Sequence, residues 1–330
     1  MSGTKLVMGA SGFLGSHVTR KLVERGDRVR VWVRRSSSTV AFDDLDVERH
    51  HGELDDEAAM RAAMTDVDTV FYCIVDARAW LRDPAPLFAT NVEALRGVLA
   101  AAVEVGVPKF VFCSTVGTIA IAESGAADET MPHNWRHLGG PYVESRLQAE
   151  ELVLRCHREQ ALPAVVLNVA TTYGPRDHGP TPHGKLVRAA ARGRMPAYVK
   201  GVSMEVIGIE DAADAFLLAE EHGRLGERYI VSERYLPIKE LFDIAAEEGE
   251  ARQPLVGIPL PAMRVIGTVG GRVSRMLRKD SVVTPTSVRL MHIQTPLDHT
   301  KATRELGWSP APVEDSIRAG VRWFLDKPPG

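Results

Sequence analysis

A glycine-rich turn near the N-terminus constrains the fold of this 330-residue chain more than any other feature. It follows a short apolar strand at 5–8 and precedes apolar residues at helical spacing. In such a turn one glycine allows the tight bend, one lets backbone N–H groups approach a pyrophosphate, and one lets the helix pack close to the sheet. The turn therefore predicts a dinucleotide site on a parallel α/β sheet, built from Gly9, Ser11, Gly12, Phe13, Leu14 and Gly15.

Strands and helices alternate through the first half of the chain. We expect strands at 29–33, 68–75, 110–114 and 164–169, and helices at 54–64, 86–105 and 142–160, which together predict a doubly wound parallel sheet. After about residue 175 prolines and glycines become frequent and the elements shorten, to 206–209, 211–222, 228–231 and 238–248. We therefore predict a dinucleotide-binding Rossmann domain at 1–175 and a smaller, mostly helical substrate lobe at 176–330. Segments near 211–245 are expected to pack back on the first domain.

Composition excludes several classes of protein. The chain is 45% hydrophobic and 25% charged with a net charge of −3, so it has no basic excess for nucleic acid. Three cysteines without ligand spacing predict no metal site and a reducing cytoplasm. His50 and His51 are expected on a solvated turn. The stretch 255–270 is too short and too interrupted by proline and arginine to span a bilayer, and we expect no membrane partner.

The end of the second strand indicates which dinucleotide binds. NAD-preferring sites place a carboxylate there to hold the ribose 2′-OH. Here the position is Val33, and Arg34, Arg35 and Ser36 follow. Guanidinium and hydroxyl groups bind a 2′-phosphate, so we predict NADP(H) over NAD(H). The alternative is that the arginines only solvate a loop.

The Gly-x-x-Gly-x-x-Gly spacing resembles the short-chain dehydrogenase/reductase superfamily. Gly-Ala-Ser-Gly-Phe-Leu-Gly-Ser-His is similar to its extended branch, which includes nucleotide-sugar epimerases, dihydroflavonol reductases and 3β-hydroxysteroid dehydrogenases. Later segments resemble the family's motifs in the same order. They are Asn91-Val92, the strand 110–115, the helix 142–150, Tyr173-Gly-Pro175, 209–214 and 304–310. The chain looks closest to the dihydroflavonol-reductase-like and 3β-hydroxysteroid-dehydrogenase-like group.

The resemblance also implies further cofactor contacts. Glu53, with Leu54, occupies the place of the family's Gly-Asp-Leu carboxylate, which faces the adenine amino group. Further residues expected to line the cofactor are Ile74, Val75, Val169 and Thr171.

The resemblance implies a catalytic set as well. Tyr142 matches the phenol that exchanges a proton with the substrate oxygen, and Thr115 matches the hydroxyl that bonds the same oxygen. Asn91 is expected to order the site. Arg146 stands four residues after Tyr142, where the family has the lysine that holds the nicotinamide ribose and lowers the tyrosine pKa.

Arginine at this position departs from the family pattern and leaves two interpretations open. It keeps the positive charge, but it is longer and planar, and it cannot shuttle a proton as an amine can. In one interpretation Arg146 does the electrostatic work of the lysine, and Tyr142 and Arg146 also bind the cofactor. In the other the chain has lost catalysis and binds the dinucleotide for another purpose.

The segment that would meet the phosphates of a sugar nucleotide, at 195–210, contains Lys200 as its one cation, and Arg194 precedes it. Apolar side chains favour an alicyclic or aromatic carbonyl substrate, although the same residues could form the core of the lobe. They are Met204, Val206, Met263, Ile266, Met276 and Leu277.

We predict an NADPH-dependent reductase/dehydrogenase of a small-molecule ketone or aldehyde. The alternatives are a nucleotide-sugar epimerase/dehydratase and a catalytically impaired NADP(H)-binding redox sensor. The helices at 86–105 and 142–160 match a pair that joins dimers in many extended members, so a homodimer is expected. The side chains that could face a partner, unless they are buried within one chain, are Leu95, Val98, Leu99, Leu147, Leu152 and Leu154.

Overall fold

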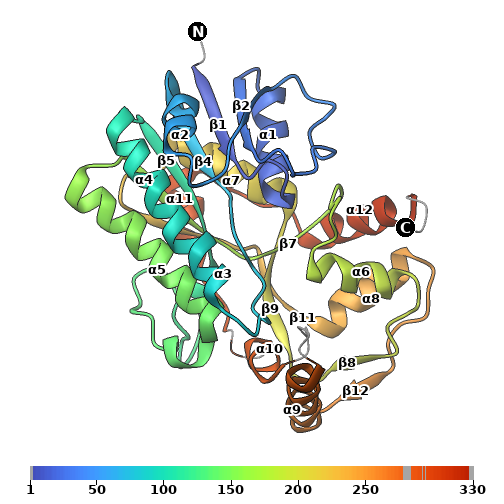
Figure 1. The fold of residues 1–330 in the computed structure, drawn as a ribbon. Coiled ribbons are helices and arrows are strands. Elements are labelled where there is room, and N and C mark those ends of the chain that lie inside the picture. The colour runs from blue at the N-terminus through green and yellow to red at the C-terminus, as the bar shows by residue number, and fades with distance from the viewer. Residues whose placement is uncertain (1–2, 278–283, 292, 294, 327–330) are drawn as a thin grey trace.

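A seven-stranded parallel sheet forms the centre of the computed structural model, which describes residues 3–277, 284–291, 293 and 295–326 (Figure 1). The strand order is β10-β6-β5-β4-β1-β2-β3, and every neighbouring pair is parallel. The order of the first six strands is that of the doubly wound dinucleotide fold, and it confirms the predicted α/β class. The strands are β1 (Thr4–Met8), β2 (Arg28–Val33), β3 (Glu48–His51), β4 (Val67–Tyr72), β5 (Lys109–Thr115), β6 (Ala164–Val169) and β10 (Arg228–Val231).

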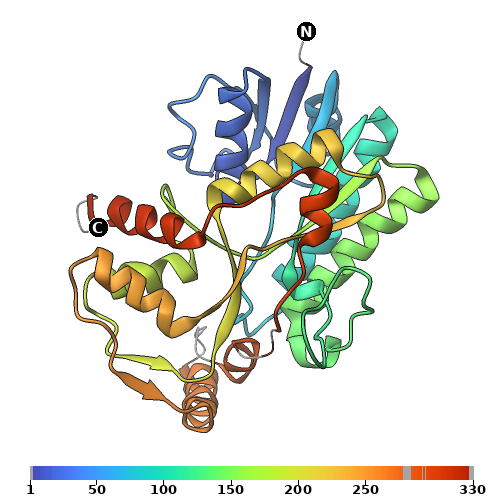
Figure 2. The ribbon, with the colours of Figure 1, turned by 180° about the vertical axis from the view of Figure 1, so that it is seen from behind.

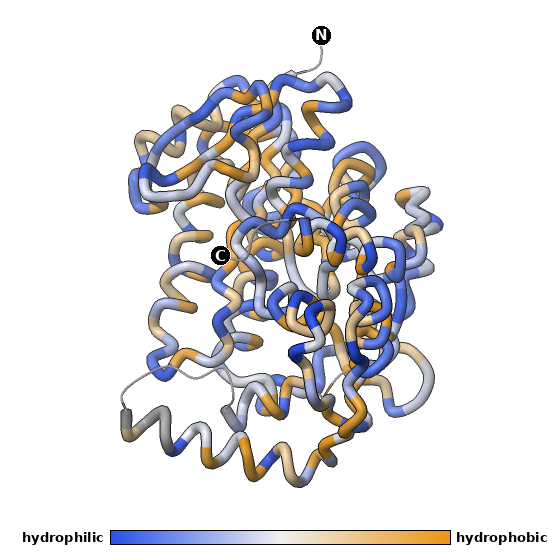
Figure 3. The backbone as a smooth tube through the Cα atoms, turned by 90° about the vertical axis from the view of Figure 1, so that its right-hand side faces the viewer, coloured by the Kyte–Doolittle hydropathy of each residue, from blue (hydrophilic) through white to orange (hydrophobic). Residues whose placement is uncertain are grey.

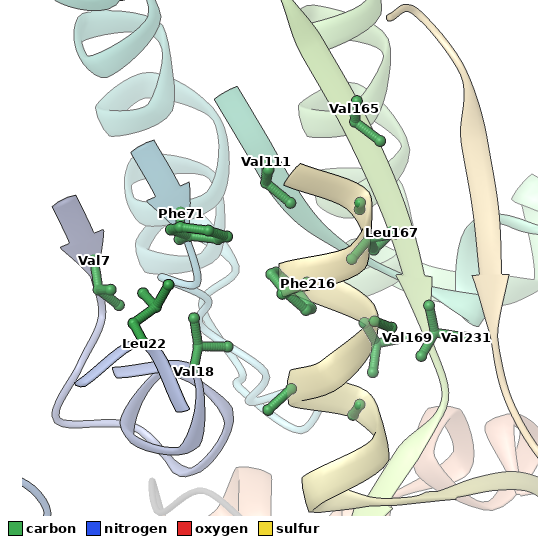
Figure 4. Close-up of a cluster of buried hydrophobic side chains, with 14 of the residues drawn as sticks. Val7, Val18, Leu22, Phe71, Val111, Val165, Leu167, Val169, Phe216 and Val231 are labelled. Carbon is green, nitrogen blue, oxygen red and sulfur yellow. The ribbon is translucent and has the colours of Figure 1, made fainter. Parts of the chain in front are cut away.

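Helices cover both faces of this sheet because its strands are apolar on both sides. Residues of α1 (Phe13–Glu24), α7 (Ile209–His222) and α11 (Thr300–Leu306) bury one face. Figure 4 shows Val18, Leu22 and Phe216 from the first two of these helices among strand residues such as Val7 and Phe71. The other face is buried by α2 (Glu57–Met64), α4 (Ala94–Val105) and α5 (Arg136–Gln160). Figure 2 shows α7 and α11 from behind.

The second part of the molecule combines small sheets with helices. β7 (Thr171–Tyr173), β9 (Ser203–Gly208) and β11 (Arg234–Pro237) form one sheet, and β8 (Ala197–Val199) pairs with β12 (Val256–Ile258). A separate core joins α6 (Pro182–Ala191), α8 (Ile238–Glu248) and α12 (Val313–Asp326). Two further helices, α9 (Leu260–Leu277) and α10 (Pro285–Leu290), lie at the lower end in Figure 1. Of the later segments, α7 and β10 belong to the large sheet's layers, and the boundary at 175 stays a prediction.

Two local expectations were wrong. His50 and His51 lie in β3, which pairs with β2, rather than on a turn. The helix expected at 86–105 is divided into α3 (Ala85–Phe88), a π-helical turn η1 (Ala89–Glu93) and α4. The extra residue of such a turn rotates the side chains that follow it relative to those that precede it.

The α4 residues predicted to face a dimer partner are buried within the chain. Leu95, Val98 and Leu99 pack into the core against the sheet, whereas Leu147 and Leu154 on α5 are half-buried. The sequence shows an apolar stripe but not what covers it, and here the chain's own sheet does. Residues 85–105 are also the one described stretch that is long and apolar enough to cross a membrane, and 44% of its most apolar window is buried inside the structure.

Candidate functional site

The glycine turn has the geometry that a phosphate cradle requires. Gly9 has a φ of +98°, and a Cβ on Gly15 would lie 2.2 Å from the Gly9 carbonyl oxygen, so neither position accepts a side chain without a backbone shift. Gly12 donates its N–H to Gly9 O at 2.9 Å and is the N-cap of α1, with no side-chain cap. The next amides, of Phe13 and Leu14, have no partner within their own helix, which makes this end an anion site. The residues present therefore fit a dinucleotide pyrophosphate.

Positive charge lies beside the end of β2. The strand ends at the buried Val33, and Arg34, Arg35 and Ser36 follow it with exposed side chains. Across the described residues neither arginine forms an ion pair with a protein carboxylate. Glu53 is also exposed, in the connection from β3 to α2, with Leu54 half-buried beside it.

The other predicted cofactor residues lie along the carboxyl edge of the sheet. Ile74 and Val75 follow β4, Val169 ends β6, and Thr171 begins β7. Ile74 and Thr171 are half-buried, and Val75 is exposed. The strand order reverses between β1 and β4, and ligands of open α/β sheets bind outside the carboxyl ends at such a reversal.

A break in α5 sets the position of Tyr142. Gly140 has non-helical φ and ψ of 67° and −173°, and regular helix begins with Pro141. The turn before the break is fastened by Trp135, whose Nε1 donates to Ile119 O at 2.8 Å. The helix expected to start at 142 therefore starts at 136 with a kink, and Tyr142 lies in the first turn after it.

Tyr142 and Thr115 meet at the end of β5. Thr115 lies near enough to the Tyr142 phenol to act on its pKa, and Thr115 Oγ1 accepts from Gly117 N at 3.1 Å. Burial raises the pKa of the Tyr142 phenol, while the positive charge of Arg146 and the polar side chain of Thr115 lower it in part. The phenol is thus protonated at neutral pH and able to donate a proton.

Arg146 is a buried cation with unused donors. Its side chain is 1% exposed, its Nη2 donates to Cys113 O at 2.5 Å, and its Cζ lies 5.3 Å from the centre of the Phe112 ring. Its Nε and Nη1 have no hydrogen-bond partner, and no carboxylate of the described residues pairs with it. Buried N–H groups without acceptors are unfavourable, so this arrangement fits a ligand that brings acceptor oxygens, as ribose hydroxyls do.

Asn91 joins two elements of the site. Its Oδ1 accepts from Asp76 N at 2.8 Å, and its Nδ2 donates to Asp76 O and Ser145 Oγ, both at 3.0 Å. It therefore fastens the loop after β4 to α5, and these contacts make it a positioning residue.

Sequence reasoning missed Glu150, eight residues after the tyrosine on α5. This buried carboxylate accepts hydrogen bonds from Ser114 Oγ at 2.5 Å, Thr118 Oγ1 at 2.7 Å and Asn168 Nδ2 at 2.7 Å. It also pairs with Arg228, with Nη1 at 2.9 Å. The network joins α5 to the ends of β5 and β6. The spacing of two helical turns was the only available signal, because the partners come from four separate segments.

The apolar residues considered for the substrate mouth are dispersed. Met204 and Val206 are buried in the core around α6, α8 and α12, which agrees with the core alternative. Met263 is buried, and Ile266 and Met276 are exposed on α9. The side chain of Leu277 lies outside the described part. Within the described part, no group of three or more His, Cys, Asp or Glu side chains could hold a metal ion.

Comparisons with known proteins agree with this geometry. Residues 5–232 match the profile of the NAD dependent epimerase/dehydratase family. The chain is 29% identical to sterol demethylase protein B of Methylococcus capsulatus, covering 98% of this chain and 99% of the relative. It is 28% identical to a putative dihydroflavonol 4-reductase of Synechocystis, with 98% and 95% covered. The crystal structure of gox2253 is 33% identical with a TM-score of 0.87, over 98% of each chain.

Proposed function

Because the chain belongs to the NAD-dependent epimerase/dehydratase family, the extended short-chain dehydrogenases/reductases, we propose that it is an NADPH-dependent reductase. It would interconvert a ketone or aldehyde and an alcohol on an apolar alicyclic or aromatic substrate. One observation carries this proposal. The Tyr142–Thr115 hydroxyl pair lies at the carboxyl edge of the sheet beside a buried cation with two unused N–H groups.

The residues divide the work of carbonyl reduction. Tyr142 donates its proton to the carbonyl oxygen, and Thr115 hydrogen-bonds the same oxygen as negative charge develops on it. When bound, a reduced nicotinamide supplies the hydride. In the reverse direction Tyr142 accepts the proton of the alcohol, and the positive charge of Arg146 stabilises the tyrosinate.

Arg146 would also hold the cofactor. The free Nε and Nη1 are available to donate to ribose hydroxyls, while Cys113 O and the Phe112 ring keep the guanidinium in place. A guanidinium offers several donors in a fixed plane, which suits this dual task.

The preference for NADPH rests on Arg34 and Arg35. A 2′-phosphate beside the end of β2 would meet two exposed guanidinium groups and Ser36. Replacing both arginines with alanine is expected to raise the KM for NADPH at least about tenfold while leaving NADH nearly unchanged. Arg155→Ala, an exposed arginine on α5, is the control. An equal loss for both cofactors would argue against a phosphate-binding role.

The substrate class is supported by relatives and by the chemistry around the hydroxyl pair. One relative is named for a sterol and another for a dihydroflavonol, both ring compounds with large apolar surfaces. A Cβ on Gly117 would lie 3.5 Å from Thr115 and 4.0 Å from Val143 Cγ2, so a glycine and an apolar side chain border the pair on that side.

The direct experiment is NADPH and NADH oxidation with a panel of cyclic, aromatic and steroidal ketones and aldehydes. Tyr142→Phe is expected to reduce turnover by about 10²-fold or more with NADPH binding unchanged, because only the proton donor is lost. Tyr198→Phe, on β8, serves as the matched control. Cofactor binding without turnover on any member, together with binding of a sugar nucleotide, would favour an epimerase/dehydratase. Cofactor binding with neither turnover nor binding of a sugar nucleotide would favour a redox sensor.

A homodimer in the cytoplasm completes the proposal. The half-buried Leu147 and Leu154 on α5 remain available for a partner, and the three cysteines are free thiols. Light scattering on the purified protein would give the oligomeric state.

A further inference from the structure

Helix α9 turns an apolar face to solvent. Val265, Val269 and Met276 are 64%, 52% and 79% exposed, and their spacing of four and eleven residues places them on one side of the helix. Ile266, next to them, is 45% exposed. Figure 3 shows this helix along the lower edge of the molecule, with hydrophobic and hydrophilic residues interspersed. Neighbouring large apolar side chains of a soluble protein normally point inward, so this face needs an explanation.

The opposite side of α9 is the one that packs on the protein. Met263 is buried, and a Cβ on Gly267 would lie 2.9 Å from Val288 Cγ2 of α10. A Cβ on Gly271 would lie 3.0 Å from Pro285 Cδ. The helix is therefore attached through glycines, and its larger aliphatic side chains face outward.

Positive charge accompanies the apolar face. Arg264 and Arg272 are exposed; Arg272, seven residues after Val265, lies on the same side of the helix as the apolar residues, and Arg264 lies on the flank. From 260 to 291 the sequence holds six basic residues and one acidic residue, a net charge of +5 in a chain whose total is −3. An apolar stripe beside arginines is the pattern of helices that lie in the interface of an anionic bilayer.

The same region borders the proposed active site. α10 lies between α9 and the start of α5, where a Cβ on Gly140 would lie 2.8 Å from Thr286 Cγ2. Gly140 is two residues before Tyr142. A surface that touches α9 is therefore separated by α10 from the turn of α5 that carries Tyr142.

We propose that the outer face of α9 docks this protein on an anionic lipid surface, with Val265, Val269 and Met276 in the interface and Arg264 and Arg272 at the phosphate headgroups. The docking itself is independent of the proposed reductase activity. Delivery of an apolar substrate from the bilayer to Tyr142 would rest on that activity.

The positive charge on this face of α9 favours an anionic lipid surface as its partner over a second copy of the chain. In a symmetric dimer through this face, the arginines of one α9 would approach those of the other, which is unfavourable without intervening acids. Phosphate headgroups supply the negative charge instead. The prolines and arginine that prevent residues 255–270 from spanning a bilayer do not prevent this mode of binding, because an interfacial helix lies parallel to the surface.

Vesicle flotation with the full-length protein tests the proposal. Wild type is expected to float with phosphatidylcholine vesicles that contain about 30% phosphatidylglycerol, less with pure phosphatidylcholine, and less as salt rises. The double variant V265E/V269E should lose at least about tenfold in partitioning, since carboxylates would enter the apolar layer. Leu225→Glu, which changes another exposed apolar side chain away from α9, is the control and should float like wild type.

A second variant separates charge from apolar contact. R264A/R272A should weaken binding to the anionic vesicles by roughly fivefold per arginine and leave binding to neutral vesicles almost unchanged.

Two results would overturn the proposal. One is no flotation of folded wild type with anionic vesicles at low salt. The other is a V265E/V269E protein that floats like wild type. If instead the double variant changes the oligomeric state and wild type ignores vesicles, the face joins two copies. None of these measurements requires turnover, so failure of the reductase proposal would be seen separately.

Discussion

Replacing Arg146 with methionine distinguishes a cation kept for a ligand from one kept for the fold. In the protein alone, the guanidinium gains one charge-assisted hydrogen bond, worth roughly 1.5–3 kcal/mol, and a cation–π contact, worth roughly 0.5–2 kcal/mol. Against this stand two buried N–H groups without acceptors, at roughly 1–3 kcal/mol each, and the desolvation of the charge. Methionine keeps an apolar stem that reaches as far as the position of Nε, and it removes all of these effects.

Without cofactor, the Arg146→Met protein should therefore unfold with a free energy within about 2 kcal/mol of wild type, or be more stable. With NADPH bound, wild type should become the more stable of the two proteins. A ligand at a hundred times its Kd stabilises wild type by about 2.7 kcal/mol, which is about 4 °C in Tm for a chain of this size, and the variant should lose most of that gain.

The assay is thermal unfolding with and without NADPH, combined with NADPH fluorescence titration. Arg155→Met, an exposed arginine on the same helix, should behave like wild type in both. A loss of 3 kcal/mol or more for Arg146→Met in the absence of cofactor would show that the guanidinium holds the fold together. Full stabilisation of the variant by NADPH would refute its contact with the ribose.

Four further predictions concern Gly15, Asn91, Tyr142 and Cys113. Gly15→Ala should lose about 2–4 kcal/mol of stability in denaturant unfolding and abolish NADPH binding, because its Cβ would meet Gly9 O. Gly97→Ala is the control, and it should gain about 0.5–1 kcal/mol because there is open space around Gly97 in α4. Asn91→Ala should lose about 2–3 kcal/mol by the same measurement, since three hydrogen bonds disappear. Burial raises the pKa of the Tyr142 phenol, so the rate of carbonyl reduction should stay level from about pH 6 past the ordinary tyrosine value of about 10 and fall only above it as the phenol ionises, while alcohol oxidation rises; rates in both directions check this. Burial raises the pKa of the Cys113 thiol to about 11, so iodoacetamide at pH 8 should modify it about a hundredfold more slowly in the native than in the urea-unfolded protein, as mass spectrometry would show.

The sequence predicted the elements whose own residues determine them. The strand at 164–169 and the helix at 238–248 have the predicted bounds because each is an apolar run or periodic pattern between breakers. β3 was missed because Glu-Arg-His-His has no apolar alternation. Its stability comes from pairing with β2 and from the ring of His50 stacked at 5.6 Å on Trp32. Those are tertiary contacts, which periodicity does not report.

The residues of the site also fall into those that their own local sequence identified and those that it did not. The glycine turn could be derived from its own spacing, whereas the roles of Tyr142, Thr115 and Arg146 depended on a family resemblance. The surroundings of Arg146 were not predictable, since its hydrogen-bond acceptor lies 33 residues earlier in the chain. For Asn91, the sequence suggested an ordering role, but its partners Asp76 and Ser145 come from the fold.

The arrangement of α5 argues that the arginine is a working replacement for lysine. Tyr142, Arg146 and Glu150 recur every four residues on one side of the helix, and the hydrogen bonds of Glu150 fix that side against the ends of β5 and β6. The guanidinium of Arg146 lies over the Phe112 ring, which helps to hold the long side chain in place. An arginine without a function at this position would be expected to pair with a carboxylate or to extend into solvent. Arg146 does neither among the described residues, and its free N–H groups lie beside the tyrosine whose pKa its charge lowers.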